Sequence, residues 1–61
     1  MSATPGAARR EIRRNATYVR DLLRQIEAAA KRGDWSAIDE IANEASCAVA
    51  DCGTIAMEVT A

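Results

Sequence analysis

Apolar residues recur at helical spacing from Ala7 to Lys31, a stretch that contains no Gly and no Pro. They form three adjacent rows, a stripe that is broader than a coiled-coil seam and typical of a helix facing a core. The rows are made of Ile12, Val19 and Ile26, of Leu22 and Ala29, and of Ala16, Leu23 and Ala30. Thr4 suits the N-cap and Pro5 the first helical position, so we expect a helix over about residues 5–32.

A compact signal then ends this helix and starts another. Lys31 and Arg32 suit a helix C-terminus, Gly33 suits the left-handed position beyond it, and Asp34 is a good N-cap. We expect a second helix over about residues 35–58, with Gly53 as its weakest position. Its expected inward rows are Trp35, Ala42, Val49 and Ala56, then Ile38, Ala45, Cys52 and Val59, with Ile41, Ala48 and Ile55 alongside.

Two long helices joined by a turn at residues 33–34 must lie antiparallel. The predicted fold class is therefore all-α, a single helical-hairpin domain over residues 1–61 with a flexible lead at 1–4 and a fraying tail at 59–61. Asn15 falls on an apolar row of the first helix, either as a tolerated polar residue near the helix start or as a buried amide that fixes the register.

Composition adds an argument for self-association. The chain has 61 residues, and only ten of them are Ile, Val or Leu, against 14 Ala. A core this small is marginal on its own, and each apolar stripe is wider than one neighbouring helix can cover. We therefore expect two hairpins to associate into a four-helix bundle as a homodimer. The predicted oligomer core consists of Ile12, Val19, Leu22, Leu23, Ile26, Ile38, Ile41, Ala45, Val49, Cys52 and Ile55.

Charge divides the chain into two halves. Residues 1–32 hold all eight Lys and Arg with three acids, a net charge of +5, and residues 33–61 hold six acids and no base, a net charge of −6. In the antiparallel hairpin, positions that face each other have numbers summing to roughly 67. This register places Arg24 near Asp39, Glu40 and Asn43, Arg20 near Glu44, and Arg9 near Glu58. We expect such pairs between a basic and an acidic helix to account for most of the charge.

The expected ion pairs do not account for several of the arginines, and we consider these arginines, together with Trp35, candidates for partner binding. They are either a solvated face, a surface for an acidic protein, or phosphate contacts for RNA or DNA. The acidic half, the net charge of −1 and the lack of interleaved aromatics, with Tyr18 as the one candidate for base stacking, oppose nucleic acid. The candidate partner-binding residues are Arg9, Arg10, Arg13, Arg14, Arg20, Arg24 and Trp35.

In length and two-helix layout the chain resembles the plasmid Rop family of short helical hairpins. That resemblance implies a dimer that binds RNA. The RNA-binding alternative would use the basic side of the first helix, through Arg10, Arg13, Arg14, Arg20 and Arg24.

Catalytic and metal chemistry finds little support in the residue types. The chain has no His, so the two cysteines have no imidazole base, and the spacing of Cys47 and Cys52 fits neither a zinc site nor a redox dithiol. We expect Cys52 in the core and Cys47 on the outside, free to form a disulfide between chains if oxidised. Glu40 and Glu44 lie one turn apart, but we interpret them as a solvated acidic face. We therefore expect no enzyme activity, no metal and no cofactor.

No segment is apolar enough to span a bilayer, although the basic first helix could lie on an anionic membrane. The resulting hypothesis is a cytoplasmic, non-enzymatic interaction protein that binds a protein partner through its charged outer faces. The high content of Ala and Arg in a short chain suits a bacterium or phage, where a small modulator of host proteins is a reasonable role.

Overall fold

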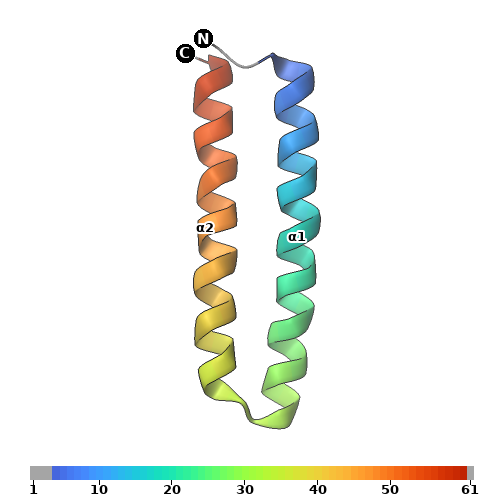
Figure 1. Cartoon of the computed structure of the whole chain (residues 1–61), viewed down its shortest axis with the longest axis vertical. Coiled ribbons are helices and arrows are strands. Elements are labelled where there is room, and N and C mark those ends of the chain that lie inside the picture. The colour runs from blue at the N-terminus through green and yellow to red at the C-terminus, as the bar shows by residue number, and fades with distance from the viewer. Residues whose placement is uncertain (1–3, 61) are drawn as a thin grey trace.

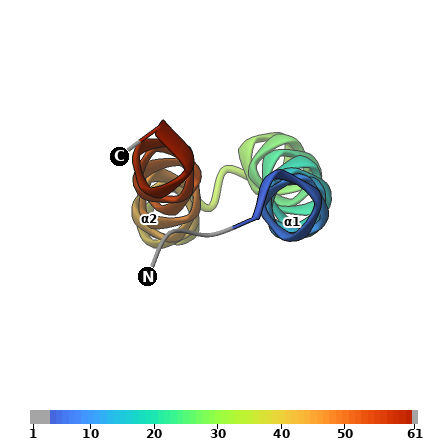
Figure 2. The same ribbon diagram turned by 90° about the horizontal axis from the view of Figure 1, so that it is seen from above.

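The computed structural model describes residues 4–60 and consists of two helices, α1 (Pro5–Arg32) and α2 (Trp35–Thr60). The helices lie side by side and antiparallel in a rod about 45 Å long (Figure 1), and the end-on view shows one helix pair with no third layer (Figure 2). The predicted all-α hairpin is confirmed. Helix α2 continues two residues beyond the expected end at 58, so Val59 and Thr60 are helical, while positions 1–3 of the expected lead and Ala61 lie outside the described residues.

Both ends of α1 have the caps that the sequence predicts. The Thr4 side chain accepts a hydrogen bond from the backbone N–H of Ala7 at 3.2 Å, which satisfies one of the free donors at the start of α1. At the other end Gly33 has φ 73° and ψ 24°, the left-handed conformation that glycine adopts without a Cβ clash. The N–H of Gly33 donates to the Ala30 carbonyl and that of Asp34 to the Ala29 carbonyl, a Schellman motif that ends the helix.

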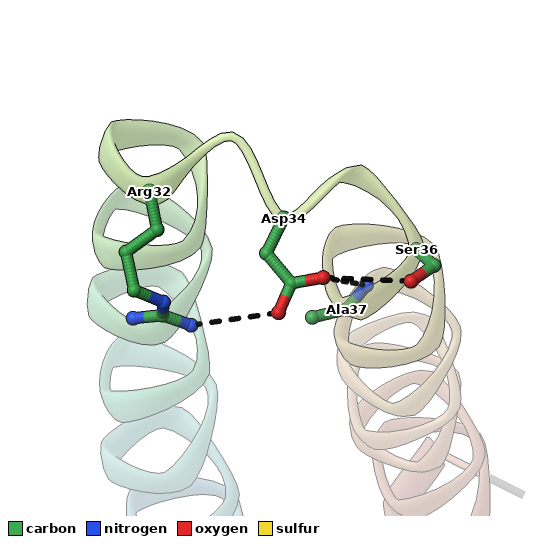
Figure 3. A network of polar contacts seen from close by, with 4 residues as sticks. All are labelled: Arg32, Asp34, Ser36 and Ala37. Atoms are coloured by element: carbon green, nitrogen blue, oxygen red, sulfur yellow. Dashed lines mark hydrogen bonds and ion pairs between the residues drawn. The ribbon is translucent and has the colours of Figure 1, made fainter.

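Asp34 connects the turn to both helices (Figure 3). Its Oδ1 accepts hydrogen bonds from the Ala37 backbone N–H at 3.3 Å and from the Ser36 hydroxyl at 3.4 Å, so it caps the start of α2. Its Oδ2 lies 3.9 Å from the Arg32 guanidinium at the end of α1. The turn is thereby fixed by backbone conformation and by side-chain contacts.

The core is one narrow seam between the helices. Seam positions alternate in steps of three and four residues along each helix, the spacing of an a/d coiled-coil contact. The buried members are Ala8, Leu22 and Ala29 of α1 and Ala45, Ala48 and Ile55 of α2. Half-buried members are Ile12, Asn15, Val19 and Ile26 of α1 and Ile38, Ile41, Cys52 and Val59 of α2.

This seam is narrower than the stripe expected from the sequence. The row through Leu23 and the row through Trp35 and Val49 lie outside it, with Leu23 49%, Val49 57% and Trp35 69% exposed. One neighbouring helix covers only the two rows that point directly at it, and the third row of each stripe therefore faces solvent in the single chain.

Asn15 occupies a seam position near the open end of the hairpin, where it is half-buried. Within residues 4–60, no buried side-chain nitrogen or oxygen lacks a hydrogen-bond partner, and no hydrogen bond joins the Asn15 amide to another residue. Within one chain the amide therefore reaches solvent, which favours the interpretation of a tolerated polar residue.

Candidate interaction surfaces

The seam divides the flanks of the hairpin into two faces of opposite character. One flank is formed by the residues four positions after the half-buried Ile12, Val19 and Ile26 of α1 and by the corresponding residues of α2. In an antiparallel pair these flanking positions lie on the same side of both helices. They are almost entirely apolar, and we call them the apolar face: Ala16, Leu23, Ala30, Trp35, Ala42, Val49 and Ala56.

The opposite flank is acidic. We define the acidic face as Glu11, Tyr18 and Gln25 of α1 with Glu44, Asp51 and Glu58 of α2. Across this face the Glu44 carboxylate interacts with the Tyr18 hydroxyl and raises the pKa of Tyr18. Desolvation and the negative charges of Glu44 and Asp21 act in the same direction. A carboxylate beside the phenol favours the neutral hydroxyl and repels the phenolate, so Tyr18 stays protonated to higher pH than a free tyrosine.

The outer side of α1 carries most of the cations. We define the basic surface as Arg10, Arg13, Arg14, Arg20, Arg24 and Lys31. All six are exposed, and they occupy helix positions that point away from α2. The candidate residue Arg9 stands apart from them, beside the apolar face.

The ion pairs expected between the basic and acidic helices do not form. Arg32 with Asp34 is the one ion pair within the described part of the chain, and none joins Arg24 to Asp39 or Glu40, Arg20 to Glu44, or Arg9 to Glu58. The physical reason is rotational. Arg20 and Arg24 lie on the back of α1 and Arg9 lies beside the apolar face, whereas Glu44 and Glu58 belong to the acidic face. Residues whose numbers sum to roughly 67 therefore lie at the same height on the two helices, but their charged groups are not within ion-pair distance.

An apolar pocket opens at the end of the hairpin opposite the turn. It has a volume of about 280 Å³ and is lined by Pro5, Ala8, Arg9 and Ile12 of α1 and by Ala56, Val59 and Thr60 of α2. Arg9 and Ala56 belong to the side of the apolar face, so the pocket continues that face at its far end. Sequence reasoning missed this pocket, and its available signal was the small side chains of Ala8 and Ala56, which both line it.

The remaining candidate groups lie apart from one another. Trp35 is at the turn end, while Cys47 is exposed on the outside of α2 and Cys52 is half-buried in the seam, both as free thiols. Among residues 4–60 there is no group of three or more acidic, Cys or His side chains that could hold a metal ion. Neither helix of the described chain is long and apolar enough to cross a membrane.

Comparison with known proteins gave no match to a protein-family model, a curated protein or a solved structure.

Proposed function

We propose that this chain is a non-enzymatic interaction protein that forms a homodimer and binds a protein partner through its charged outer surfaces, chiefly the basic surface. The observation that carries the proposal is that none of the six cations on the back of α1 makes an ion pair within residues 4–60. Cations without intramolecular partners on one side of a rigid helix provide a surface for electrostatic complementarity with an acidic protein.

Self-association rests on the apolar face. Leu23, Trp35 and Val49 are large apolar residues with about half or more of their surface exposed, and alanines connect them into one patch. Contiguous apolar patches of this kind mark interaction sites. We propose that a second copy of the chain covers the apolar face. At each height along the hairpin, one of the two helices contributes a large residue to this face and the other a small one. A two-fold contact can therefore place large residues of one copy on small residues of the other.

The biological role that we propose for this protein is that of a small modulator of host proteins, encoded by a bacterium or a phage. The acidic face and the basic surface lie on different sides of the hairpin, so both stay accessible when the apolar face is covered. A dimer of this kind presents each charged surface twice, which increases avidity for a partner with repeated sites.

Affinity capture from a bacterial lysate, compared between matched charge variants, tests the partner-binding role. We expect a protein that is recovered with the wild-type chain to be lost with Arg13→Glu/Arg20→Glu and kept with Glu44→Lys/Asp51→Lys. The control pair changes charge by the same amount on the other side of the molecule. Equal recovery by both variants would contradict the proposed role of the basic surface.

An electrophoretic mobility shift with generic RNA and DNA distinguishes the nucleic-acid alternative. Phosphate contacts weaken steeply with salt, so the assay is run at low and at moderate salt concentration. A shift at low salt that Arg13→Glu/Arg20→Glu abolishes would overturn the proposal of a protein partner.

A further inference from the structure

Two features of the apolar face lie at opposite ends of the hairpin. Trp35, the first residue of α2, is 69% exposed at the turn end, and the apolar pocket lies at the open end. Trp35 and the pocket residue Ala56 belong to the same row along α2, three heptads apart. A single chain cannot bring them together, because about 32 Å separate residues 35 and 56 along the helix.

Building on the proposed homodimer, we propose that Trp35 of each copy fills the end pocket of the other copy. The two hairpins then pack apolar face to apolar face with their turns at opposite ends. A two-fold axis perpendicular to the helices exchanges the turn end with the open end, so both Trp35 side chains find a pocket at once. Such an interface is closed and self-complementary.

The remaining residues of the apolar face fit this arrangement. When Trp35 lies over Ala56, the same symmetry places Leu23 of one copy on Ala16 of the other, and Val49 on Ala42. Each large side chain therefore meets a small one along the whole contact. The other face-to-face arrangement, with both turns at the same end, pairs Trp35 with Ala30 and leaves both pockets uncovered.

The chemistry of the pocket suits an indole ring. Its lining is apolar except for the side chains of Arg9 and Thr60. A guanidinium is attracted to the face of a Trp ring, and more strongly once water is excluded. The pocket has a volume of about 280 Å³, which admits a single large side chain. Trp is one of the residue types enriched among the energetically dominant residues of protein interfaces.

Quenching of Trp35 fluorescence tests the arrangement, because Trp35 is the only Trp of the chain. A nitroxide label is attached at Met57→Cys, an exposed position next to the pocket that does not line it, in a Cys47→Ser/Cys52→Ala background. The oligomeric state of the labelled protein is measured by sedimentation equilibrium. Nitroxides quench at short range, so a label at 57 reaches Trp35 only from another chain. We expect a species of about 13 kDa, twice the 6.5 kDa of one chain, whose emission is quenched and recovers on dilution to monomer. A label at Ser36→Cys is the positive control that quenches in every state.

Two outcomes separate the proposals. A 13 kDa dimer without quenching overturns the Trp35 arrangement and leaves the proposed homodimer intact. A 6.5 kDa monomer at every concentration overturns both.

Variants of the pocket give an independent measurement. We expect Trp35→Ala and Ala56→Gln each to raise the dimer dissociation constant at least about tenfold. The double variant should raise the constant by less than the product of the two single effects, because both substitutions remove the same contact. Ala50→Gln, on the outer side of α2, is the matched control and should leave the constant unchanged. Additive effects of the two substitutions would overturn the proposed contact.

Discussion

Tyr18 of α1 and Glu44 of α2 interact across the acidic face of the hairpin. This contact raises the pKa of Tyr18 above its ordinary value near 10. The folded chain therefore holds the phenol proton more tightly than the unfolded chain does. The stability that this contact contributes is fully present below the unfolded pKa and is lost as pH rises through the folded pKa.

We predict that Tyr18, the only Tyr of the chain, titrates above pH 10 in the folded protein. Absorbance near 295 nm follows phenolate formation directly. Glu44→Gln should lower the midpoint, because the amide carries no negative charge to oppose the phenolate. Asp51→Asn is the matched control, because Asp51 lies on the same face but the negative charges that raise the Tyr18 pKa are those of Glu44 and Asp21. A midpoint that moves equally in both variants would contradict the assignment.

The neighbouring residues Leu22 and Leu23 should have separable roles. Leu22 is 2% exposed in the seam, so Leu22→Ala leaves a cavity between the helices and should destabilise the fold by about 2–5 kcal/mol. We expect this variant to dissociate and unfold together, as judged by circular dichroism and sedimentation. A folded monomeric Leu22→Ala would show that dimerisation and folding are not coupled.

Leu23 lies on the apolar face and is 49% exposed. Leu23→Ala should therefore keep the helical signal at high protein concentration and shift the proposed dimer toward monomer on dilution. A loss of helicity equal to that of Leu22→Ala would place Leu23 in the intramolecular core, against the structure.

Two glycines should respond in opposite directions to the same substitution. Gly33→Ala places a Cβ on a residue with φ 73° and should destabilise the hairpin by about 1–2 kcal/mol. Gly53 is exposed inside α2, and an added Cβ meets no atom within 4 Å. Gly53→Ala should therefore stabilise the chain by about 0.5–1 kcal/mol. Thermal unfolding of both variants checks the sign of each effect.

The Asp34 carboxylate combines a cap with an ion pair, and the cap should matter more. Asp34→Ala removes the hydrogen bond to the Ala37 N–H and should cost about 0.5–2 kcal/mol. Arg32→Ala removes only an exposed ion pair at 3.9 Å and should cost at most about 1 kcal/mol. Chemical unfolding measures both values, and a larger loss for Arg32→Ala would reverse the proposed order.

The sequence alone predicts the helices and the turn because each boundary has a local cause. Thr4, Gly33 and Asp34 act through their own backbone and a few neighbours, so their roles do not depend on the rest of the fold. The line of closest contact between the helices is different. The row containing Trp35 and Val49 is as apolar as the row containing Ile41 and Ile55, and periodicity does not say which row faces the other helix.

The error in the expected ion pairs has the same origin. Net charges of +5 and −6 can be read directly from the sequence, but a contact between two side chains depends on how each helix is rotated about its axis. In the structure Arg20 and Arg24 lie on the back of α1, away from α2. The pocket could not be predicted for a related reason, because it depends on how the open ends of α1 and α2 are placed in three dimensions.

The brevity of the turn has a consequence for how the chain folds. Ala29 and Ile38 meet after closing only a short loop, and each following pair of facing residues lengthens that loop a little, so the entropic cost of every step stays small. Contacts that are local in this sense favour rapid folding that starts at Gly33 and progresses toward Ala8 and Val59. Backbone amides should then exchange with solvent hydrogen in a gradient, slowest beside the turn and fastest at the open end.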